Sequence, residues 1–231
     1  MIPIISFGGI EAIETQRVYG TGTSAAARLI GLVFCRPESR LAQSEIIPAL
    51  TYFNCRAERN VSFYFGGYQG DHDESHNQDP GAIVTVAGPD GRCWYFSPRL
   101  FDEFRRDVEA RTTWRYSGES DFILTDVRYK GDDPRYRYAY LDFTSCMVVR
   151  LDKLASLAPA PTVSALFERV FQYAERQDRQ NPTWGFSDSL ASGIARSGIW
   201  NVVLSFLPDS LRGDVRGAAN VVVSDISAAH S

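Results

Sequence analysis

The fold of this chain is constrained most by six apolar segments that alternate between two periodicities. In some of them the apolar residues are continuous or recur at every second position, as in strands. In others they recur every three to four positions, as on one face of a helix. Such alternation is typical of a β-sheet covered by helices, so we expect all six to close over one interior. The segments are residues 28–35, 61–67, 98–108, 121–127, 138–149 and 163–174.

The order of these segments predicts the fold class. From residue 28 onwards we expect a strand, a helix, a strand, a hairpin, a helix, two strands and a helix. This predicts an α/β (α+β) fold with a mixed central β-sheet and helices packed on it. With one hairpin added, it is also the order of a thioredoxin-like layout. The expected division is an N-terminal extension (1–27), a core domain (28–180) and a C-terminal extension (181–231) that packs on the core or on a partner.

Turn and cap residues locate several elements. The tetrapeptide 88–91 (GPDG) lies between two apolar runs and predicts a tight hairpin turn. A helix over 98–111 is predicted because a proline occupies its first position, directly after a serine that can cap it. A further helix over 44–54 is expected to begin at Ser44, although Pro48 lies inside it.

Charge and hydropathy exclude several classes of function. The 231 residues carry a formal net charge of −4, and the pI is about 5.4. No global positive field therefore attracts phosphate backbones or anionic lipid, and nucleic acid is a disfavoured partner. The apolar run 199–207 is interrupted by Asn201 and Ser205. It is much shorter than the roughly 20 apolar residues of a bilayer span, so no membrane span is expected.

The cysteines and the first residues predict a cytoplasmic protein. No two of the four cysteines are close in sequence, and they lie in apolar segments, as buried free thiols do in a reducing compartment. The first residues show neither a basic region nor a small-residue cleavage site, so no secretory signal is expected.

The segment 114–121 (WRYSGESD) is the first candidate for chemistry. It joins a predicted helix to a predicted strand and brings a cation, hydroxyls, carboxylates and two rings together. In the catalytic interpretation Arg115 holds a small anionic ligand and Glu119 acts as a base, and Ser117 and Asp121 complete the set. We favour a structural turn with buried rings, because turn residues of this kind are common between helices and strands.

The loop 70–79 (GDHDESHNQD) contains the densest group of metal-capable side chains. His72 and His76 would share one side of a helix, and Asp71, Asp73 or Asp79 could complete the ligand set of a divalent metal. The segment has no apolar periodicity, however, so a solvated loop is the favoured interpretation. No other cofactor is predicted.

Two further motifs are incomplete. The segment 20–25 (GTGTSA) resembles half of a dinucleotide-binding turn, but no clear strand precedes it, and a turn without this function is favoured. Cys35 ends the first predicted strand, where a thioredoxin-like protein would begin a Cys-x-x-Cys motif. The second cysteine is missing, so a buried structural thiol is favoured.

Basic and aromatic residues alternate across the hairpin predicted between 128 and 138. Cations with interleaved tyrosines suit phosphate contact and base stacking. Asp132 and Asp133 at the tip oppose that use, and a solvated hairpin with a period of two is the favoured interpretation.

Two functions from different classes remain. The first is an intracellular interaction or regulatory module that binds a protein partner through an apolar tail segment. The second is a hydrolase or nucleotide-acting enzyme that uses the 114–121 turn, assisted by a metal in the 70–79 loop. The enzyme hypothesis expects these two segments to converge on one pocket. The tail residues of the first hypothesis are Ile199, Trp200, Val203 and Leu207.

Overall fold

The structure, a computed structural model, describes residues 2–21, 27–57, 61–70, 84–131, 137–157, 162–176 and 222–227. Its strands are β1 (Ile2–Ile4), β2 (Ala27–Phe34), β3 (Val61–Gly66), β4 (Tyr68–Gly70), β5 (Val84–Ala87), β6 (Cys93–Phe96), β7 (Asp121–Lys130), β8 (Tyr138–Arg150) and β9 (Val223–Asp225). Its α-helices are α1 (Phe7–Thr21), α2 (Leu50–Ala57), α3 (Pro98–Arg111), α4 (Leu151–Leu157) and α5 (Thr162–Arg176).

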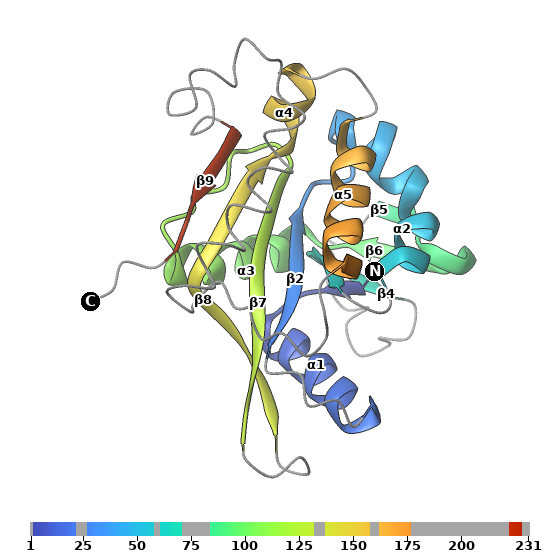
Figure 1. Ribbon diagram of the computed structural model, residues 1–231. Helices are drawn as coiled ribbons and strands as arrows, with labels where there is room; N and C mark the ends of the chain where they lie inside the picture. Colours follow the sequence, from blue (N-terminus) through green and yellow to red (C-terminus); the bar gives the residue numbers. More distant parts are fainter. Residues whose placement is uncertain are drawn as a thin grey trace.

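A mixed sheet with the strand order β1-β3-β2-β7-β8-β9 forms the centre of the described chain (Figure 1). β1, β3 and β2 are mutually parallel, whereas β7, β8 and β9 each run antiparallel to the strand before them in this order. The predicted mixed α/β sheet is therefore confirmed. The four central strands, β3-β2-β7-β8, with β7 antiparallel to the other three, keep the thioredoxin-like order, and β1 and β9 extend it at its two edges.

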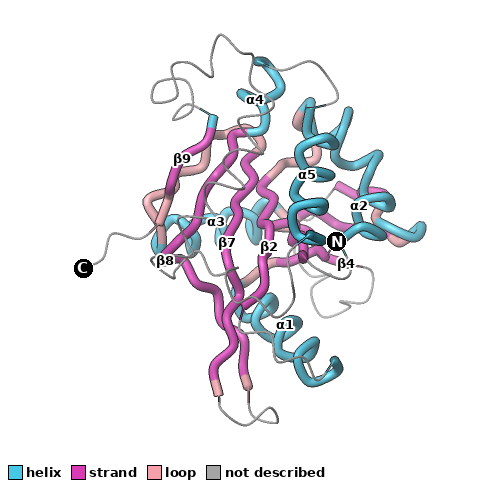
Figure 2. The backbone as a smooth tube through the Cα atoms, in the orientation of Figure 1, coloured by secondary structure: helices cyan, strands magenta, loops and turns pink. Residues whose placement is uncertain are grey.

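Helices cover both faces of this sheet (Figure 2). On one face α5 packs beside α2, and Phe167 of α5 meets Phe63 of β3 with ring centroids 4.9 Å apart. On the other face Phe104 of α3 meets Phe34 of β2 at 5.3 Å, and Phe7 of α1 meets Phe104 at 5.1 Å. Large side chains therefore leave the strands in both directions, and each set is covered by its own pair of helices.

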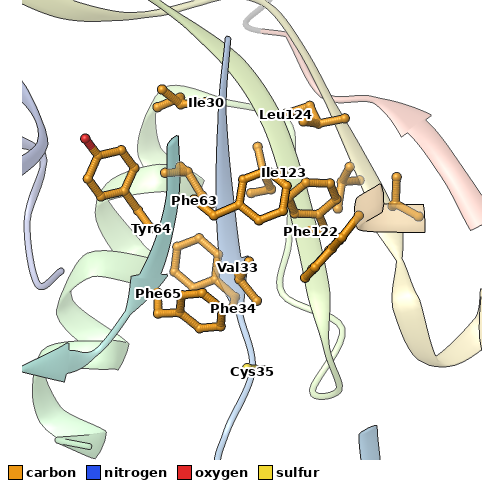
Figure 3. Packing of buried hydrophobic residues seen from close by; sticks show 14 of the residues in the cluster. Ile30, Val33, Phe34, Cys35, Phe63, Tyr64, Phe65, Phe122, Ile123 and Leu124 are labelled. Atoms are coloured by element: carbon orange, nitrogen blue, oxygen red, sulfur yellow. The ribbon is translucent and has the colours of Figure 1, made fainter. Parts of the chain in front are cut away.

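Aromatic rings of the sheet pack against Phe167 of α5, which lies 4.9 Å from the ring centroids of both Phe63 and Phe122. Figure 3 shows Phe63 and Phe122 among the buried residues of β2, β3 and β7. Phe63 of β3 and Phe122 of β7 meet with ring centroids 5.0 Å apart, although β2 lies between their strands. The residue of β2 opposite Phe63 is Gly31, which has no side chain to separate the two rings. The absence of a side chain at Gly31 therefore lets rings from β3 and β7 pack against each other across β2.

A small antiparallel sheet, β4-β6-β5, follows β3 in the chain. Gly67 separates β3 from β4 with φ of +82°, and a Cβ atom there would lie 2.5 Å from Cβ of Phe101. For this reason the strand expected over the apolar segment 61–67 ends at Gly66, and the chain continues as a separate strand, β4. The hairpin predicted across 88–91 is confirmed as β5 and β6, with Gly91 at φ +73°.

The helix expected over 44–54 begins earlier and is irregular. Ser44 does not cap it; instead Oγ of Ser39 accepts the Ala42 N–H at 3.2 Å. A π-helical turn (Ala42–Ile46) and a 3-10 turn (Ile47–Ala49) then precede α2. Pro48 has no N–H to donate to the carbonyl four residues earlier, which explains the change of hydrogen-bond register at this point.

Residues 2–21, assigned from the sequence to an extension, contribute to the same interior. β1 pairs in parallel with β3 through the register Ile2↔Tyr64 to Ile4↔Gly66. Ile4, Phe7 and Ile10 are buried in the main hydrophobic cluster.

The packing around Gly31 predicts a strong effect of one added methyl group. A Cβ atom at this position would lie 2.4 Å from Phe122 and 3.1 Å from Phe63. We expect Gly31→Ala to lower the free energy of unfolding by about 1–3 kcal/mol, the usual cost of overpacking a core. Gly8→Ala is the matched control, because Gly8 is a helical glycine with open space around it. Urea unfolding of both variants checks this, and an equal effect would contradict the packing argument.

Candidate functional site

The carboxylate of Asp121, the first residue of β7, is the centre of the 114–121 turn. The side chain is fully buried. Its Oδ2 accepts the indole N–H of Trp114 at 3.0 Å and the backbone N–H of Ser117 at 3.1 Å, and its Oδ1 accepts the Ser117 hydroxyl at 2.9 Å. Arg150 of β8 donates to Oδ2 at 2.5 Å. The carboxylate therefore ties the turn to two neighbouring strands.

Burial and hydrogen bonding shift the pKa of this carboxylate in opposite directions. Burial raises the pKa of Asp121, while the Arg150 guanidinium and the hydrogen bonds from Ser117 and Trp114 oppose that rise. Both oxygens already accept hydrogen bonds, so accepting a proton from a substrate would require Asp121 to give up contacts that hold the turn.

The other predicted catalytic side chains lie on the surface of the same turn. Arg115 is exposed, and its Nη1 donates to the carbonyl oxygens of Trp114 at 2.6 Å and Glu109 at 3.0 Å, next to the end of α3. Glu119 is exposed, and its N–H donates to the Ser117 hydroxyl at 3.1 Å. The turn thus brings Ser117 and Asp121 into contact and leaves Arg115 and Glu119 towards solvent. Their catalytic role stays a prediction.

The turn is joined to the carboxyl end of β2. The hydroxyl oxygens of Ser120 and Ser39 lie 3.4 Å apart, and Ser39 follows β2 in the chain. The backbone N–H of Ser120 donates to the carboxylate of Asp152 in α4 at 2.7 Å. The carboxyl ends of parallel strands are where ligands commonly bind in α/β folds. The 114–121 turn therefore occupies a suitable place for a site.

Arg36 and Tyr116 lie beside the 114–121 turn, and both contact the ring of Phe101. The Arg36 guanidinium lies 5.1 Å from the ring centroid of Phe101, and the Tyr116 ring meets the same Phe101 at 5.3 Å. The Tyr116 hydroxyl oxygen is buried, and no described residue forms a hydrogen bond of regular geometry with it. Burial raises the pKa of Tyr116, against the effect of Arg36, so the hydroxyl stays protonated near neutral pH.

Cys35, at the position where a thioredoxin-like redox motif would begin, is a buried thiol. The Tyr68 hydroxyl donates to its carbonyl at 3.0 Å. Burial raises the pKa of the Cys35 thiol to about 12, and the contact with Tyr68 only partly opposes this. Because the thiolate is the nucleophile and the thiol is buried, we expect Cys35 to react slowly at neutral pH.

The predicted metal ligands His72, Asp73 and His76 lie outside the described residues, and so does their expected convergence with the 114–121 turn. Among the described residues, no group of three His, Cys, Asp or Glu side chains could hold a metal ion. Residues 20 and 21 of the 20–25 segment end α1, the rest of the segment lies outside the described residues, and β2 is the next described element. A dinucleotide-binding turn instead joins a strand to the helix after it, so this connection has the opposite order.

A buried polar cluster beneath α1 was missed by the sequence analysis. Glu14 is fully buried, and its two oxygens accept the hydroxyls of Tyr64 at 2.5 Å and Tyr129 at 3.4 Å. The guanidinium groups of Arg17 and Arg28 lie 3.9 and 3.8 Å from the same carboxylate. The only local signal was the Glu14–Arg17 spacing of three within α1; the other members come from three separate strands, which no sequence pattern connects.

β7 and β8 continue past Ala27, the first residue of β2, as a two-stranded arm, which Figure 1 shows extending beside α1. We call residues 128–131 and 137–140 the hairpin arm. Its register places Tyr140 opposite Arg128 and Tyr138 opposite Lys130, so these four side chains share one face. Tyr138 and Tyr140 are 50% and 37% exposed.

The opposite face of the hairpin arm is covered by α1. Ala139, between the two exposed tyrosines, is buried, and its N–H donates to Thr15 of α1 at 2.8 Å. Tyr129, opposite Ala139 in the register, reaches Glu14. The hairpin arm is therefore supported on one face and exposes aromatic side chains on the other.

Comparison of the chain with protein-family models, with curated proteins and with solved structures found no match.

The hydrogen bonds of Asp121 predict that it matters for folding. We expect Asp121→Asn to lower the free energy of unfolding by about 2–3 kcal/mol, because Arg150 loses its charged partner and a hydrogen-bonded network is broken. Glu119→Gln, on the exposed part of the same turn, should change stability by less than about 0.5 kcal/mol. Urea unfolding of the two variants measures both effects, and similar values for the two would refute this role of Asp121.

The burial of Cys35 predicts both its reactivity and a dependence of stability on pH. A thiol reagent should modify the exposed Cys55 at once and Cys35 only on unfolding. Because the folded-state pKa of about 12 exceeds the ordinary 9.0, the stabilisation is complete below pH 9 and declines as pH rises towards 12. From pH 8 to pH 10 the wild type should lose about 1 kcal/mol more unfolding free energy than Cys35→Ala. Equal losses would contradict the assigned pKa.

Proposed function

We propose that this protein is a non-catalytic interaction module that binds a protein partner through the hairpin arm. The observation that carries the proposal is the pair of neighbouring exposed tyrosines, Tyr138 and Tyr140, on one face of a two-stranded projection. Tyrosine is enriched at interfaces because its ring buries a large apolar area while its hydroxyl keeps a hydrogen-bond partner.

The rest of the described surface offers less to a partner. Among the described residues, the other large apolar side chains with comparable exposure are Tyr19 and Tyr52. The Tyr52 hydroxyl already donates to Glu168 at 2.8 Å. The pair on the hairpin arm combines two rings on neighbouring positions of one face, which is the arrangement expected of an interface centre.

An intracellular location agrees with this proposal. All four cysteines are free thiols, and Cys35 and Cys146 are buried. Free cysteines are typical of a reducing compartment. Within the described residues, no helix has the length and apolar character needed to cross a membrane. The apolar tail residues 199–207, the first proposed partner surface, lie outside the described residues.

The enzyme hypothesis is the alternative. Its support is the place of the 114–121 turn at the carboxyl end of β2, beside Arg36 and the buried Tyr116 hydroxyl. Against it stand the engagement of Asp121 in the turn and the exposure of Glu119. We therefore prefer the interaction module.

The proposal is tested by replacing the exposed rings. A tagged Tyr138→Ser/Tyr140→Ser variant should retain its fold, because both side chains are exposed, but should capture about tenfold less of its partner from cells that contain this protein naturally. Tyr52→Ser is the matched control, since it removes an equally exposed tyrosine on a different element. Circular dichroism and thermal unfolding verify the fold. If all three forms capture the same proteins in the same amounts, or if the wild type captures none, the hairpin arm is not a docking surface.

A further inference from the structure

We infer that the partner surface recognised by the hairpin arm is an acidic protein segment. This inference rests on the proposed function and adds the chemistry of the partner. The juxtaposition that supports it is that of Lys130, which forms no ion pair with any described residue, with the exposed tyrosine pair at the start of β8.

The cations of the hairpin arm differ in how far they are already neutralised. Arg128, nearer the body of the sheet, lies 2.8 Å from the carboxylate of Asp142. Lys130 is exposed and has no carboxylate partner within the described part of the chain, although it lies opposite Tyr138. Arg137 donates its Nε–H to the Gly131 carbonyl at 3.0 Å and likewise makes no ion pair there. Within the described part of the arm, Lys130 and Arg137 thus carry positive charges that no described carboxylate neutralises.

Other arginines of the described chain already bind carboxylates. Arg56 binds Glu168 at 2.9 Å, and Arg105 binds Glu109 at 2.9 Å, each within or between helices. The sequence from 128 to 140 holds four cationic and two anionic side chains, a net charge of +2 in a chain of net charge −4. The hairpin arm itself, residues 128–131 and 137–140, holds three cationic side chains and no carboxylate, in a chain that is acidic as a whole.

A carboxylate-bearing partner satisfies both components of this surface. Its acidic groups would approach Lys130 and Arg137, while its apolar atoms cover the rings of Tyr138 and Tyr140. Charge complementarity at the rim of an interface steers encounter and sets its salt dependence, whereas buried rings supply most of the affinity. Lys130, opposite Tyr138, provides the cation on the face of the two rings, whereas Arg137, one residue before Tyr138, adds charge at the end of the arm rather than on that face.

A protein segment fits this surface better than a nucleic acid does. Cations and rings also bind single strands, but such binding depends on the field of many phosphates meeting a positive surface. The net charge of −4 on the whole chain opposes that approach. An acidic segment of a protein engages a few cations at short range, which this arm can offer.

Charge reversal at the tip provides the test. Lys130→Glu/Arg137→Glu should capture about tenfold less partner than the wild type, and raising the salt to 0.5 M should weaken wild-type capture in the same direction. The matched control is Arg106→Glu/Lys153→Glu, which makes the same change of charge at exposed positions of α3 and α4. This control should capture as the wild type does.

Two anionic polymers separate the classes of partner. Poly-L-glutamate added to the lysate should compete for the wild-type arm, whereas polyuridylate of equal total charge and nuclease treatment should leave capture unchanged. Capture that resists charge reversal but is lost in the double tyrosine variant overturns the acidic partner and leaves the proposed function intact. Loss on nuclease treatment or competition by polyuridylate alone overturns it in favour of nucleic acid. Capture unaffected by the tyrosine changes rejects the proposed function itself.

Discussion

The pairing of β2 with β7 is the interaction on which the rest of the structure depends. Eight consecutive residue pairs, from Ala27↔Arg128 to Phe34↔Asp121, join the parallel strands to the antiparallel ones. The neighbouring strands and helices pack against this pair of strands. Rings from β3 and β7 meet across Gly31 of β2, and helices on both faces pack against side chains that leave β2 in alternate directions. A change of register by one residue would reverse all of these side chains between the two faces.

The two ends of β7 have different structural roles. At its first residue the Asp121 carboxylate fixes the turn that enters the sheet and contacts Arg150 of β8. At its other end the strand leaves the sheet and becomes half of the hairpin arm. Asp121 therefore helps to set where β7 begins, and so it also helps to set which residues reach the arm and which face they occupy.

Much of the fold could be predicted because apolar periodicity records burial directly. Phe101, Phe104 and Val108 share one face of α3, as their spacing predicted, and all are buried. The hairpin turn at 88–91 was predicted from glycines that accept unusual backbone angles. Ser39 was missed as a cap because the prolyl break in the following helix moves its start away from the apolar pattern.

The polar cluster around Glu14 could not be predicted for a different reason. The sequence of α1 has little amphipathic pattern, and the tyrosines and Arg28 that meet Glu14 come from strands far apart in the chain. Contacts of this kind can be predicted only once the order of the strands in the sheet is known. The role of the 114–121 turn was ambiguous in sequence for the same reason, because the partner that engages Asp121 lies on β8.

The support of the hairpin arm by α1 has a consequence for the thermodynamics of recognition. An isolated two-stranded ribbon is marginally stable in water and would have to order itself on binding. Here Thr15 and Glu14 hold the inner face of the ribbon before any partner arrives. The conformational entropy of this projection is already lost on folding, so the partner that we propose would meet a preorganised edge and would retain more of its contact energy as affinity.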